Sequence, residues 1–409
     1  MTLADLGVPY SENRGGVKKK IKKILTEMRF SDMLSSGEFQ GELVILSEDS
    51  MKAGIAWVVL VILSLTAQGL MAEGFTDFPI IVGPNNKSSP RIDGDFIAWS
   101  EYSSGDRPLY GKFITGGSQF LIASSTRAIQ FGAGGGLVAL ADPKSGAWNI
   151  YAYDLSTSSD FRVSDSPYQQ QAPRTDGKTI VWQDMRNWNG DVNIYNHDIY
   201  AYDVAAKREY LVTSNRWDQL GPSVSGNIIV WQDGRNGVPV MHNWDIYGYN
   251  IATGQEFSIA TAYEDQVAPA ISGNTVVWMD SRSYVPDASY DIWGKNLVSG
   301  QEFPICTALG GQESPAIDGR YVVWVDYRNT LGQAGHGDIY GYDLQTGQEF
   351  PICVGPSQKM EVQISGDLVV WMDDRNGNFD IYGAYIPEPA SMAFVLVGSL
   401  IFLARKRSA

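Results

Sequence analysis

The chain has 409 residues and a formal net charge of −15, and 44% of its residues are hydrophobic and 12% aromatic. The acidic excess lies between Glu73 and Pro389, where 20 Lys and Arg residues stand against 38 Asp and Glu residues. Charge of this sign repels nucleic acid and anionic lipid, so we expect no nucleic-acid partner and no attachment to a membrane through surface charge.

The first 50 residues do not show the pattern of a folded domain. They are polar, contain a lysine cluster between Lys18 and Lys23, and lack strands separated by turns. A patch for nucleic acid or membrane is one interpretation of the cluster. We favour the other, that residues 1–50 are a disordered extension upstream of the true start at Met51.

A signal peptide is predicted over residues 51–72. Lys52 gives it a basic start, an apolar run follows over residues 53–65, and small residues lead to Ala72. The run is short for a membrane span of about 20 residues, which favours a cleaved signal over a retained helix. The mature chain is therefore expected to be exported.

The chain that follows repeats itself seven times. The phrase V-V-W-x-D-x-R recurs at spacings of 49, 47, 46 and 47 residues, at Trp182, Trp231, Trp278, Trp324 and Trp371. Two weaker copies precede it, one around Trp99 and one around Leu140, which takes the place of the Trp. A period of about 47 residues is typical of a β-propeller blade.

Each repeat has the pattern of four strands. A segment such as Pro315–Gly319 ends in a turn, the V-V-W-x-D segment follows, and a D-I-Y-x-Y-D segment such as Asp338–Asp343 precedes a last strand within Thr346–Ile352. Short β-branched and aromatic runs between Gly, Asn and Pro indicate hairpins. We predict an all-β, seven-bladed propeller of four-stranded blades over residues 73–386.

The two ends of the repeat region predict how the ring closes. The last repeat stops after Asp380–Pro387 without a fourth strand, whereas Phe78-Pro79-Ile80 matches Phe350-Pro351-Ile352 of a complete repeat. We therefore expect an N-terminal strand to complete the seventh blade, which leaves few open strand edges.

The W-x-D-x-R-N-G-x-x-D-I-Y core, seen best at Trp371–Tyr382, resembles the repeat of TolB-type propellers, and the similarity covers about residues 76–386. TolB has six such blades, whereas seven are counted here. The resemblance implies a propeller fold and a habit of binding partners, and it implies no particular reaction.

Five repeats carry an Asp and an Arg two residues apart, a spacing that places both on one face of a strand. A site repeated five times would need five pockets, so we interpret these pairs as structural. We expect each Arg to reach the Asp that opens the third strand and to hold the hairpin together, and the repeated Trp and Tyr to form the core between blades. The pairs are Asp184–Arg186, Asp233–Arg235, Asp280–Arg282, Asp326–Arg328 and Asp373–Arg375, and the expected partners are Asp198, Asp245, Asp291, Asp338 and Asp380.

No motif predicts a cofactor, a metal site or a catalytic group. The acidic stretch Asp373–Asp380 is similar to a calcium loop, but Arg375 in its middle argues against converging oxygen ligands. G-x-S-x-G, H-E-x-x-H and phosphate-loop motifs are absent. Cys306 and Cys353 stand at the same place in consecutive repeats, so they should lie about a blade apart, as two free, buried thiols.

The loops between the second and third strands form the candidate binding face. From the Asp of W-x-D to the Asp of D-I-Y they span 14, 12, 11 and 12 positions in blades 3 to 6, over 184–198, 233–245, 280–291 and 326–338. Equivalent loops emerge on one face, where exposed rings suit stacking on sugars or contact with a protein. Packing among the loops explains the rings equally well. The candidate residues are Trp188, His242, Trp244, Tyr284, Tyr290 and His336.

The last 23 residues resemble the PEP-CTERM sorting signal of Gram-negative bacteria. An apolar run over residues 390–404 separates the tripeptide from a basic end; these motifs are Pro387, Glu388 and Pro389, and Arg405, Lys406 and Arg407. The resemblance implies an apolar helix that anchors the precursor transiently in the inner membrane, with its basic end inside. It also implies cleavage by an exosortase-type protease and release to the cell surface or beyond. A plain C-terminal anchor would give the same topology.

These observations favour a binding or structural module for a polysaccharide or an envelope protein. The alternative is a propeller-type polysaccharide lyase or another carbohydrate-active enzyme. It would need a His or Lys base with converging carboxylates or a metal in the central channel. His197, His242 and His336 fall in three different repeats, which argues against the enzyme. A structural layer component without a small ligand is a third interpretation.

Overall fold

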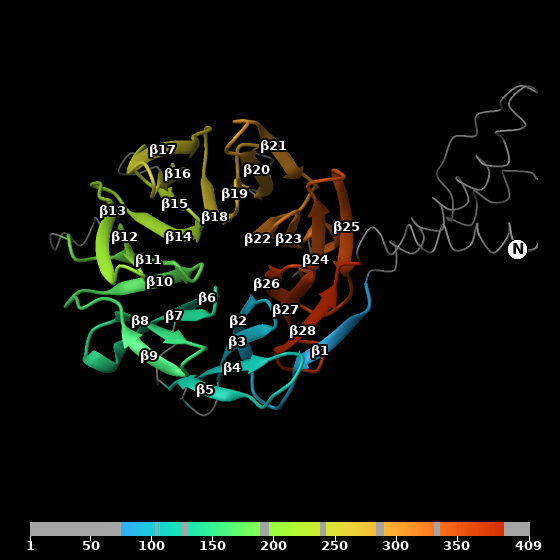
Figure 1. The fold of residues 1–409 in the computed structure, drawn as a ribbon. Helices are drawn as coiled ribbons and strands as arrows, with labels where there is room; N and C mark the ends of the chain where they lie inside the picture. The colour runs from blue at the N-terminus through green and yellow to red at the C-terminus, as the bar shows by residue number, and fades with distance from the viewer. Residues whose placement is uncertain are drawn as a thin grey trace, which may run out of the picture. The chain divides into compact units, whose positions relative to one another are not determined.

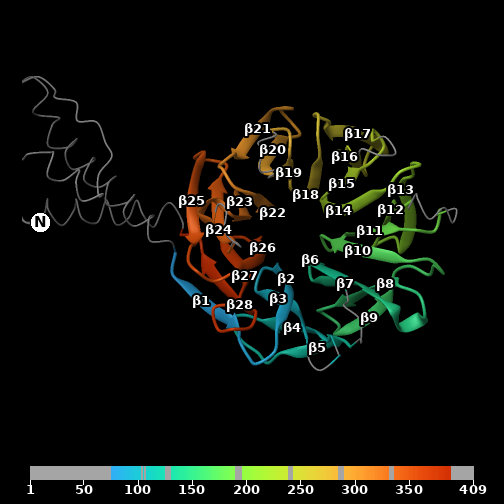
Figure 2. The same ribbon diagram turned by 180° about the vertical axis from the view of Figure 1, so that it is seen from behind.

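The folded part of the chain is a ring of seven four-stranded antiparallel sheets (Figures 1 and 2). The computed structural model of the protein describes residues 75–102, 105, 107–124, 130–188, 196–237, 243–283, 290–330 and 336–387. The predicted fold class is confirmed, including the blade built from the weak second repeat. The predicted signal peptide and the sorting tail beyond Pro387 lie outside these residues. Within them, no helix has the length and apolar character needed to span a membrane.

Each blade runs outward from an innermost strand, and the blades are numbered 1 to 7 in chain order. The innermost strands are β2 (Lys87–Asp93), β6 (Gln130–Gly134), β10 (Gln170–Thr175), β14 (Gln219–Ser225), β18 (Gln266–Ser272), β22 (Gln312–Asp318) and β26 (Lys359–Ser365). The second strands are β3 (Phe96–Glu101), β7 (Leu137–Asp142), β11 (Thr179–Asp184), β15 (Ile228–Asp233), β19 (Thr275–Asp280), β23 (Tyr321–Asp326) and β27 (Leu368–Asp373).

The outer half of each blade is a second hairpin. The third strands are β4 (Leu109–Phe113), β8 (Asn149–Asp154), β12 (Asp198–Asp203), β16 (Asp245–Asn250), β20 (Asp291–Asn296), β24 (Asp338–Asp343) and β28 (Asp380–Tyr385). The outer strands are β5 (Phe120–Ala123), β9 (Ser159–Arg162), β13 (Arg208–Thr213), β17 (Gln255–Ala260), β21 (Glu302–Cys306), β25 (Gln348–Cys353) and, in blade 7, β1 (Asp77–Ile81). Two short 3-10 helices, η2 (Pro143–Ser145) and η3 (Arg328–Thr330), follow β7 and β23.

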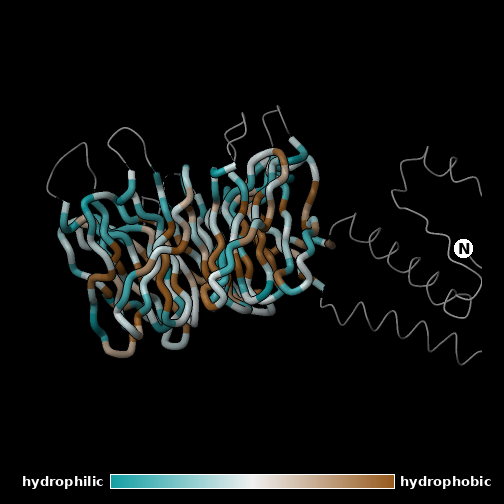
Figure 3. Tube along the Cα trace, turned by 90° about the horizontal axis from the view of Figure 1, so that it is seen from above, coloured by the Kyte–Doolittle hydropathy of each residue, from teal (hydrophilic) through white to brown (hydrophobic). Residues whose placement is uncertain are grey.

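The repeated Trp of the second strand fills the seam between neighbouring blades. All six, Trp99, Trp182, Trp231, Trp278, Trp324 and Trp371, are 0% exposed. Trp182 of blade 3, for example, packs against Ala139 and Ile150 of blade 2. A large aromatic ring buries about 150–250 Å², which at about 25 cal/mol per Å² stabilises each seam by roughly 4–6 kcal/mol. Figure 3 shows the resulting apolar band between the two ends of the strands.

Leu140 takes the Trp position in blade 2 and is also buried, so the second repeat keeps its core. The smaller side chain is accompanied by small residues on the innermost strand, where β6 contains Gly132, Ala133 and Gly134. Blade 2 therefore approaches blade 3 closely at the axis: a Cβ atom added to Gly134 would lie 2.1 Å from the carbonyl oxygen of Thr175 in blade 3.

The ring closes through the pairing of the N-terminal β1 with β28 (Figure 1). Asp77 lies opposite Ala384 and Phe78 opposite Gly383 in the antiparallel register. The Phe78 ring also stacks on Tyr385, with their centroids 5.5 Å apart. The prediction that the N-terminal strand completes the seventh blade is confirmed.

A ring of hydrogen bonds joins the turns between the first and second strands. Each of these turns contains a Gly that follows a Ser or Asp in most blades. In six of the seams the N–H of the turn Gly donates to the Ser or Asp side chain of the turn in the preceding blade, as from Gly273 to Ser225 at 3.0 Å and from Gly319 to Ser272 at 3.0 Å. The last link runs from Gly94 to Ser365 and crosses the closure. At the seam of blades 2 and 3 the acceptor position is Gly135, which has no side chain to accept such a bond. This end of the molecule is named the turn face.

Candidate functional site

The opposite end carries two kinds of connection and is named the loop face. These are the loops between second and third strands, and the crossovers from each outer strand to the next innermost strand. Main-chain hydrogen bonds join the two kinds, as from the N–H of Gly234 to the carbonyl of Asp218 at 3.0 Å and from Ser281 to Asp265 at 2.9 Å. The described first residues of these loops are therefore bonded directly to the crossovers.

The residue just before D-I-Y holds neighbouring blades together through its main chain. The carbonyl of Trp244 accepts a hydrogen bond from the N–H of Gln266 in blade 5, and its own N–H donates to the Asp265 carboxylate at 2.9 Å. Tyr290 accepts in the same way from Gln312 at 2.8 Å. Since only the backbone makes these bonds, the side chains at this position are free to differ between blades.

Four of the six predicted ligand-face residues lie in the described part of the chain. Trp188, Trp244 and Tyr290 are half-buried, and His336 is exposed. The other two, His242 and Tyr284, lie outside the described residues, together with most of the loops that carry them. The arc of loops therefore stays a prediction.

The crossovers of blades 2 to 5 add aromatic and apolar residues that the repeat pattern did not single out. Tyr263 is 79% exposed, and Tyr168 and Leu309 are also exposed on the surface. They stand two or three residues before the Gln that opens an innermost strand, where Trp217 occupies the crossover of blade 3. This recurrence before Gln was the sequence signal that could have identified them.

Two of the tryptophans flank a single glycine. A Cβ atom added to Gly234 would lie 3.5 Å from the ring of Trp244 and 3.6 Å from the Cβ of Trp217. Met185, Ser281, Tyr327 and Asp374 occupy the equivalent position in other blades. The absence of a side chain at Gly234 thus lets the ring of half-buried Trp244 and the Cβ of half-buried Trp217 approach the same point of the loop face.

The repeated Asp and Arg do form ion pairs, but the predicted third partner is wrong. In blade 4, Arg235 donates to Asp233 at 2.6 Å, lies 4.0 Å above the Tyr247 ring, and reaches Glu256 on the outer strand. The Asp that opens the third strand, Asp245, instead accepts from the amide that follows the Arg. The guanidinium lies along the Tyr ring and so extends past the third strand.

The same arrangement recurs in the other four blades. Burial opposes the charge of Arg328, but the bonds to Asp326 and Glu349 outweigh it and raise the pKa of the guanidinium. Each network therefore ties the second strand to the outer strand across the whole hairpin. The carboxylate partners are Asp184 and Glu209 for Arg186, Asp280 and Glu302 for Arg282, Asp326 and Glu349 for Arg328, and Asp373 and Asp77 for Arg375.

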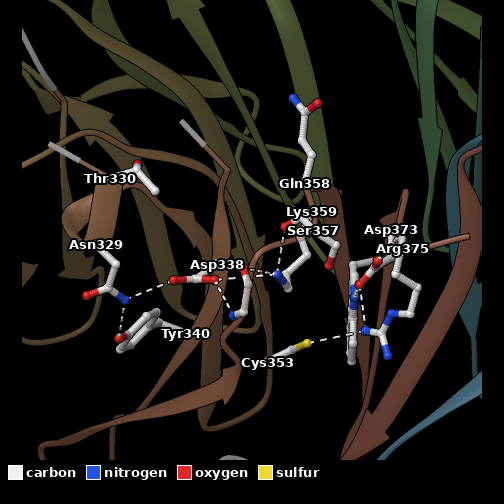
Figure 4. A network of polar contacts seen from close by, with 12 residues as sticks. Asn329, Thr330, Asp338, Tyr340, Cys353, Ser357, Gln358, Lys359, Asp373 and Arg375 are labelled. Carbon is white, nitrogen blue, oxygen red and sulfur yellow. Dashed lines mark hydrogen bonds and ion pairs between the residues drawn. The ribbon is translucent and has the colours of Figure 1, made fainter. Parts of the chain in front are cut away.

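The seam of blades 6 and 7 contains a further polar network, built around a buried lysine (Figure 4). Buried Lys359 donates to the carbonyls of Gly355 and Ser357 at 3.0 and 2.8 Å and lies 3.5 Å from Asp338. A hollow of about 500 Å³ opens beside it, lined by Asp77, Cys353, Val354, Gly355, Pro356, Ser357, Lys359, Asp374 and Arg375. Its charged groups already have partners within the protein: Asp77 pairs with Arg375, Lys359 lies beside Asp338, and Asp374 accepts from the N–H of Gln358.

Both cysteines are free and buried, as predicted. Burial raises the pKa of the Cys353 thiol to about 12, and it also raises that of Cys306. A thiol with such a pKa is protonated at neutral pH and is a poor nucleophile.

The described histidines do not form a shared site. His197 of blade 3 is half-buried with its Nδ1 atom 2.7 Å from the Asp218 carboxylate, whereas His336 belongs to blade 6. Among the described residues, no three His, Cys, Asp or Glu side chains gather where one metal ion could be held.

The geometry defines the class of protein: a seven-bladed β-propeller closed by its N-terminal strand. Known proteins agree on the fold. The propeller domain of the Trilobed protease from Pyrococcus furiosus has 13% identity and a TM-score of 0.56, covering 73% of this chain and 95% of that one. Oligogalacturonate lyase from Vibrio parahaemolyticus has 10% identity and a TM-score of 0.59, covering 77% and 94%.

TolB from Acinetobacter baumannii is also similar, with 16% identity and a TM-score of 0.47, covering 66% of this chain and 67% of that one. This score is too low to support an argument. No family model and no curated protein matches the sequence. At these identities the similarity shows the propeller fold alone, because unrelated functions share this architecture.

Proposed function

We propose that this protein is an exported, surface-associated binding module that holds a polysaccharide on its loop face. The observation that carries the proposal is the aromatic set on blades 2 to 4, where exposed Tyr168 and Tyr263 share one face with half-buried Trp217 and Trp244. A folded protein rarely exposes such rings together without a partner. Flat rings on rigid backbone offer stacking surfaces at low cost in side-chain entropy.

The backbone beneath these rings is rigid. The N–H and C=O groups of Trp244 are both bonded to the crossover of the next blade. Trp217 precedes Asp218, whose carbonyl accepts from Gly234 and whose carboxylate binds His197. Positions fixed in this way suit a repeating ligand, because successive sugar rings can meet successive aromatic side chains without rearrangement of the loops.

The acidic charge of the chain favours a neutral polysaccharide over a polyuronate. The net charge of −15 repels a polyanion at long range. The alternative function, a polyuronate lyase, is therefore less well supported, and its fold similarity at 10% identity carries no activity to this chain. Detection of eliminative cleavage of a polyuronate by the purified protein would overturn the non-enzymatic proposal.

Export and processing are part of the proposal and rest on the sequence of the two ends. The precursor would be held in the inner membrane by residues 390–404 and cut near Pro387-Glu388-Pro389 by an exosortase-type protease. Mass spectrometry of the secreted protein is expected to find no peptide beyond about Pro389. An intact C-terminus in the secreted form would contradict this part.

A glycan-array screen of the full-length protein tests the binding proposal. Binding to at least one neutral polysaccharide is expected, and Trp244→Ala and Tyr263→Ala should each weaken it about tenfold, since stacked rings contribute on the order of 1–2 kcal/mol. Val298→Ala is the matched control, because this exposed apolar residue lies in the turn between β20 and β21, on the turn face. Equal losses in all three variants, or no binding to any neutral polysaccharide on the array, would contradict a polysaccharide site on the loop face.

A further inference from the structure

One position of the innermost strands differs sharply between blades. On the second strand of each blade, one residue directly precedes the repeated Trp, or Leu140 in blade 2. The position meant here is the residue of the innermost strand that pairs with that residue, as Arg91 pairs with Ala98 before Trp99. In chain order it is Arg91, Gly132, Arg174, Ser223, Ala270, Ala316 and Gln363. Only blades 1 and 3 carry a charge there, and both charges are positive in a protein of net charge −15.

The two arginines converge on the strand between them. The guanidinium of Arg91 lies 5.9 Å from the centre of the Phe131 ring on β6. Arg174 donates to the carbonyl of the same Phe131 at 3.3 Å. A Cβ atom on Gly132 would lie 3.1 Å from the Cδ of Arg174 and 2.8 Å from the carbonyl oxygen of Pro173. Glycine at this position therefore makes room for the Arg174 side chain over β6.

Neither guanidinium is paired with two carboxylates, as the five repeated arginines of the loop face are. Within the described residues their hydrogen bonds run to carbonyls, from Arg91 to Pro90 at 2.8 Å and from Arg174 to Pro173 and Phe131. The Nε of Arg91 is buried without any partner. Both side chains nevertheless keep part of their surface exposed, so a small ligand can reach them.

The electrostatics show the cost of this arrangement. Burial and the neighbouring charge of Arg91 lower the pKa of Arg174 to about 9. Burial also lowers the pKa of Arg91, and Glu361 on β26 of blade 7 opposes the shift in both. By contrast, each of the five repeated arginines on the loop face contacts two carboxylates. Arginine side chains are protonated at neutral pH, so Arg91 and Arg174 are two positive charges on which one carboxylate, that of Glu361, acts.

We propose that Arg91 and Arg174 form a binding site for a small monocarboxylate, on the innermost strands of blades 1 to 3. A guanidinium offers a planar pair of donors that matches a carboxylate, and two of them can hold one anion from both sides. Two positive charges and the negative charge of Glu361 leave one net positive charge, which a monoanion neutralises and a phosphate dianion would exceed. The proposal is independent of the loop face, because it uses none of its residues.

Isothermal titration of the full-length protein at pH 7 tests the site. The probes are glucuronate, as an acidic sugar, and N-acetylglycine, as a peptide-like carboxylate, with glucose and N-acetylglycinamide as their neutral counterparts. Saturable binding is expected for a carboxylate and not for its neutral counterpart. The two acids together show whether the site selects the sugar or accepts carboxylates in general. Inorganic phosphate is expected to bind more weakly than the better carboxylate.

Three variants assign the binding to the arginines. Arg91→Gln and Arg174→Gln should each weaken carboxylate binding at least about tenfold, because a hydrogen bond to a charged group is lost. Ala270→Ser is the matched control at the same position of blade 5 and should bind as the wild type does. The Gln variants are also expected to melt at or above the wild-type temperature without ligand, since they remove mutual repulsion.

Several results would overturn the proposal. These are no saturable carboxylate binding by the wild type, binding unchanged in both Gln variants, or tighter binding of phosphate than of either acid. A lowered melting temperature of the Gln variants together with unchanged binding would assign the arginines a purely structural role. Loss of glycan binding in the array would leave this titration unaffected, so the two proposals fail separately.

Discussion

The contact between Asp77 and Arg375 is an ion pair that joins the N-terminal strand β1 to the last blade, and Asp77→Ala removes it. The Arg375 guanidinium donates through Nη1 and Nη2 to the two carboxylate oxygens at 3.2 and 2.8 Å, and it keeps Asp373 as a second partner. The two side chains are 30% and 25% exposed. A charge-assisted hydrogen bond contributes about 1.5–3 kcal/mol and an exposed pair about 0–1 kcal/mol. We therefore expect this partly screened pair to stabilise the strand by about 1–2 kcal/mol.

The equivalent substitution in blade 4, Glu256→Ala, is the matched control. Arg235 loses the same kind of partner there, but β17 remains joined to β16 by a hairpin turn, whereas β1 reaches β28 with no such connection. Hydrogen exchange followed by mass spectrometry should show residues 77–81 exchanging about 5–30 times faster in Asp77→Ala, as 1–2 kcal/mol implies. Exchange over residues 255–260 should change less in Glu256→Ala. Unchanged exchange of β1, or equal acceleration in the two blades, would refute the interpretation of this pair as the closure.

Three further predictions concern the seams and the buried groups. Gly135→Ala should lower the unfolding free energy measured in urea by about 2–4 kcal/mol, because Gly135 has φ 56° and an added Cβ would lie only 2.3 Å from the Asp176 carbonyl oxygen. The control Gly273→Ala, at φ 57° with no atom within 4 Å of an added Cβ, should lower it by only about 1–2 kcal/mol. Equal losses would contradict the close approach of blades 2 and 3. Cys353, with a pKa raised to about 12, should resist alkylation by iodoacetamide at pH 8 until the protein is unfolded, and rapid labelling of the native protein would count against its burial. Burial raises the pKa of Asp373, but the bonds from Arg375 outweigh it and hold the pKa below its ordinary value. The stability lost in Asp373→Asn should therefore be full above the unfolded pKa of about 3.9 and shrink as the pH falls below it, whereas a difference independent of pH would exclude this role.

The period, the four-strand pattern and the closure were predictable because they follow from features repeated along the chain. Seven copies of one pattern define the blade, and a strand missing at one end matches a spare strand at the other. Burial of the Trp followed in the same way, because an aromatic residue at the same place in six blades has equivalent neighbours in each of them. Leu140 fits this rule, since it is apolar and fills the same seam.

The contacts between side chains were less predictable. The expectation that Arg235 reaches Asp245 counted positions along the hairpin, but a guanidinium lying on Tyr247 extends to Glu256 two strands away from its own. Sequence spacing does not report the direction of a long side chain. The Asn that follows the Arg is shorter and was the better candidate for the contact with Asp245.

The crossover residues and the arginines of the innermost strands were missed because the residue type at each position changes from blade to blade. The position two or three residues before the Gln is Tyr263 in one crossover, Trp217 in another and Leu309 in a third, and Arg91 and Arg174 interrupt a position that is otherwise small or neutral. In the closed ring the crossover residues lie on one face of the propeller, and Arg91 and Arg174 lie on innermost strands of neighbouring parts of the ring. Their neighbours come from different blades, so the sequence alone could not show that they meet.

The proposed loop-face function is tested most directly by hydrogen exchange of the full-length protein. The exchange is measured with and without the neutral polysaccharide that binds the protein most strongly on the glycan array. The account predicts protection of the crossovers at residues 164–169, 214–218 and 261–265, with the turns between third and outer strands unchanged. Protection confined to the turn face, or a screen in which no neutral polysaccharide is retained, would contradict it.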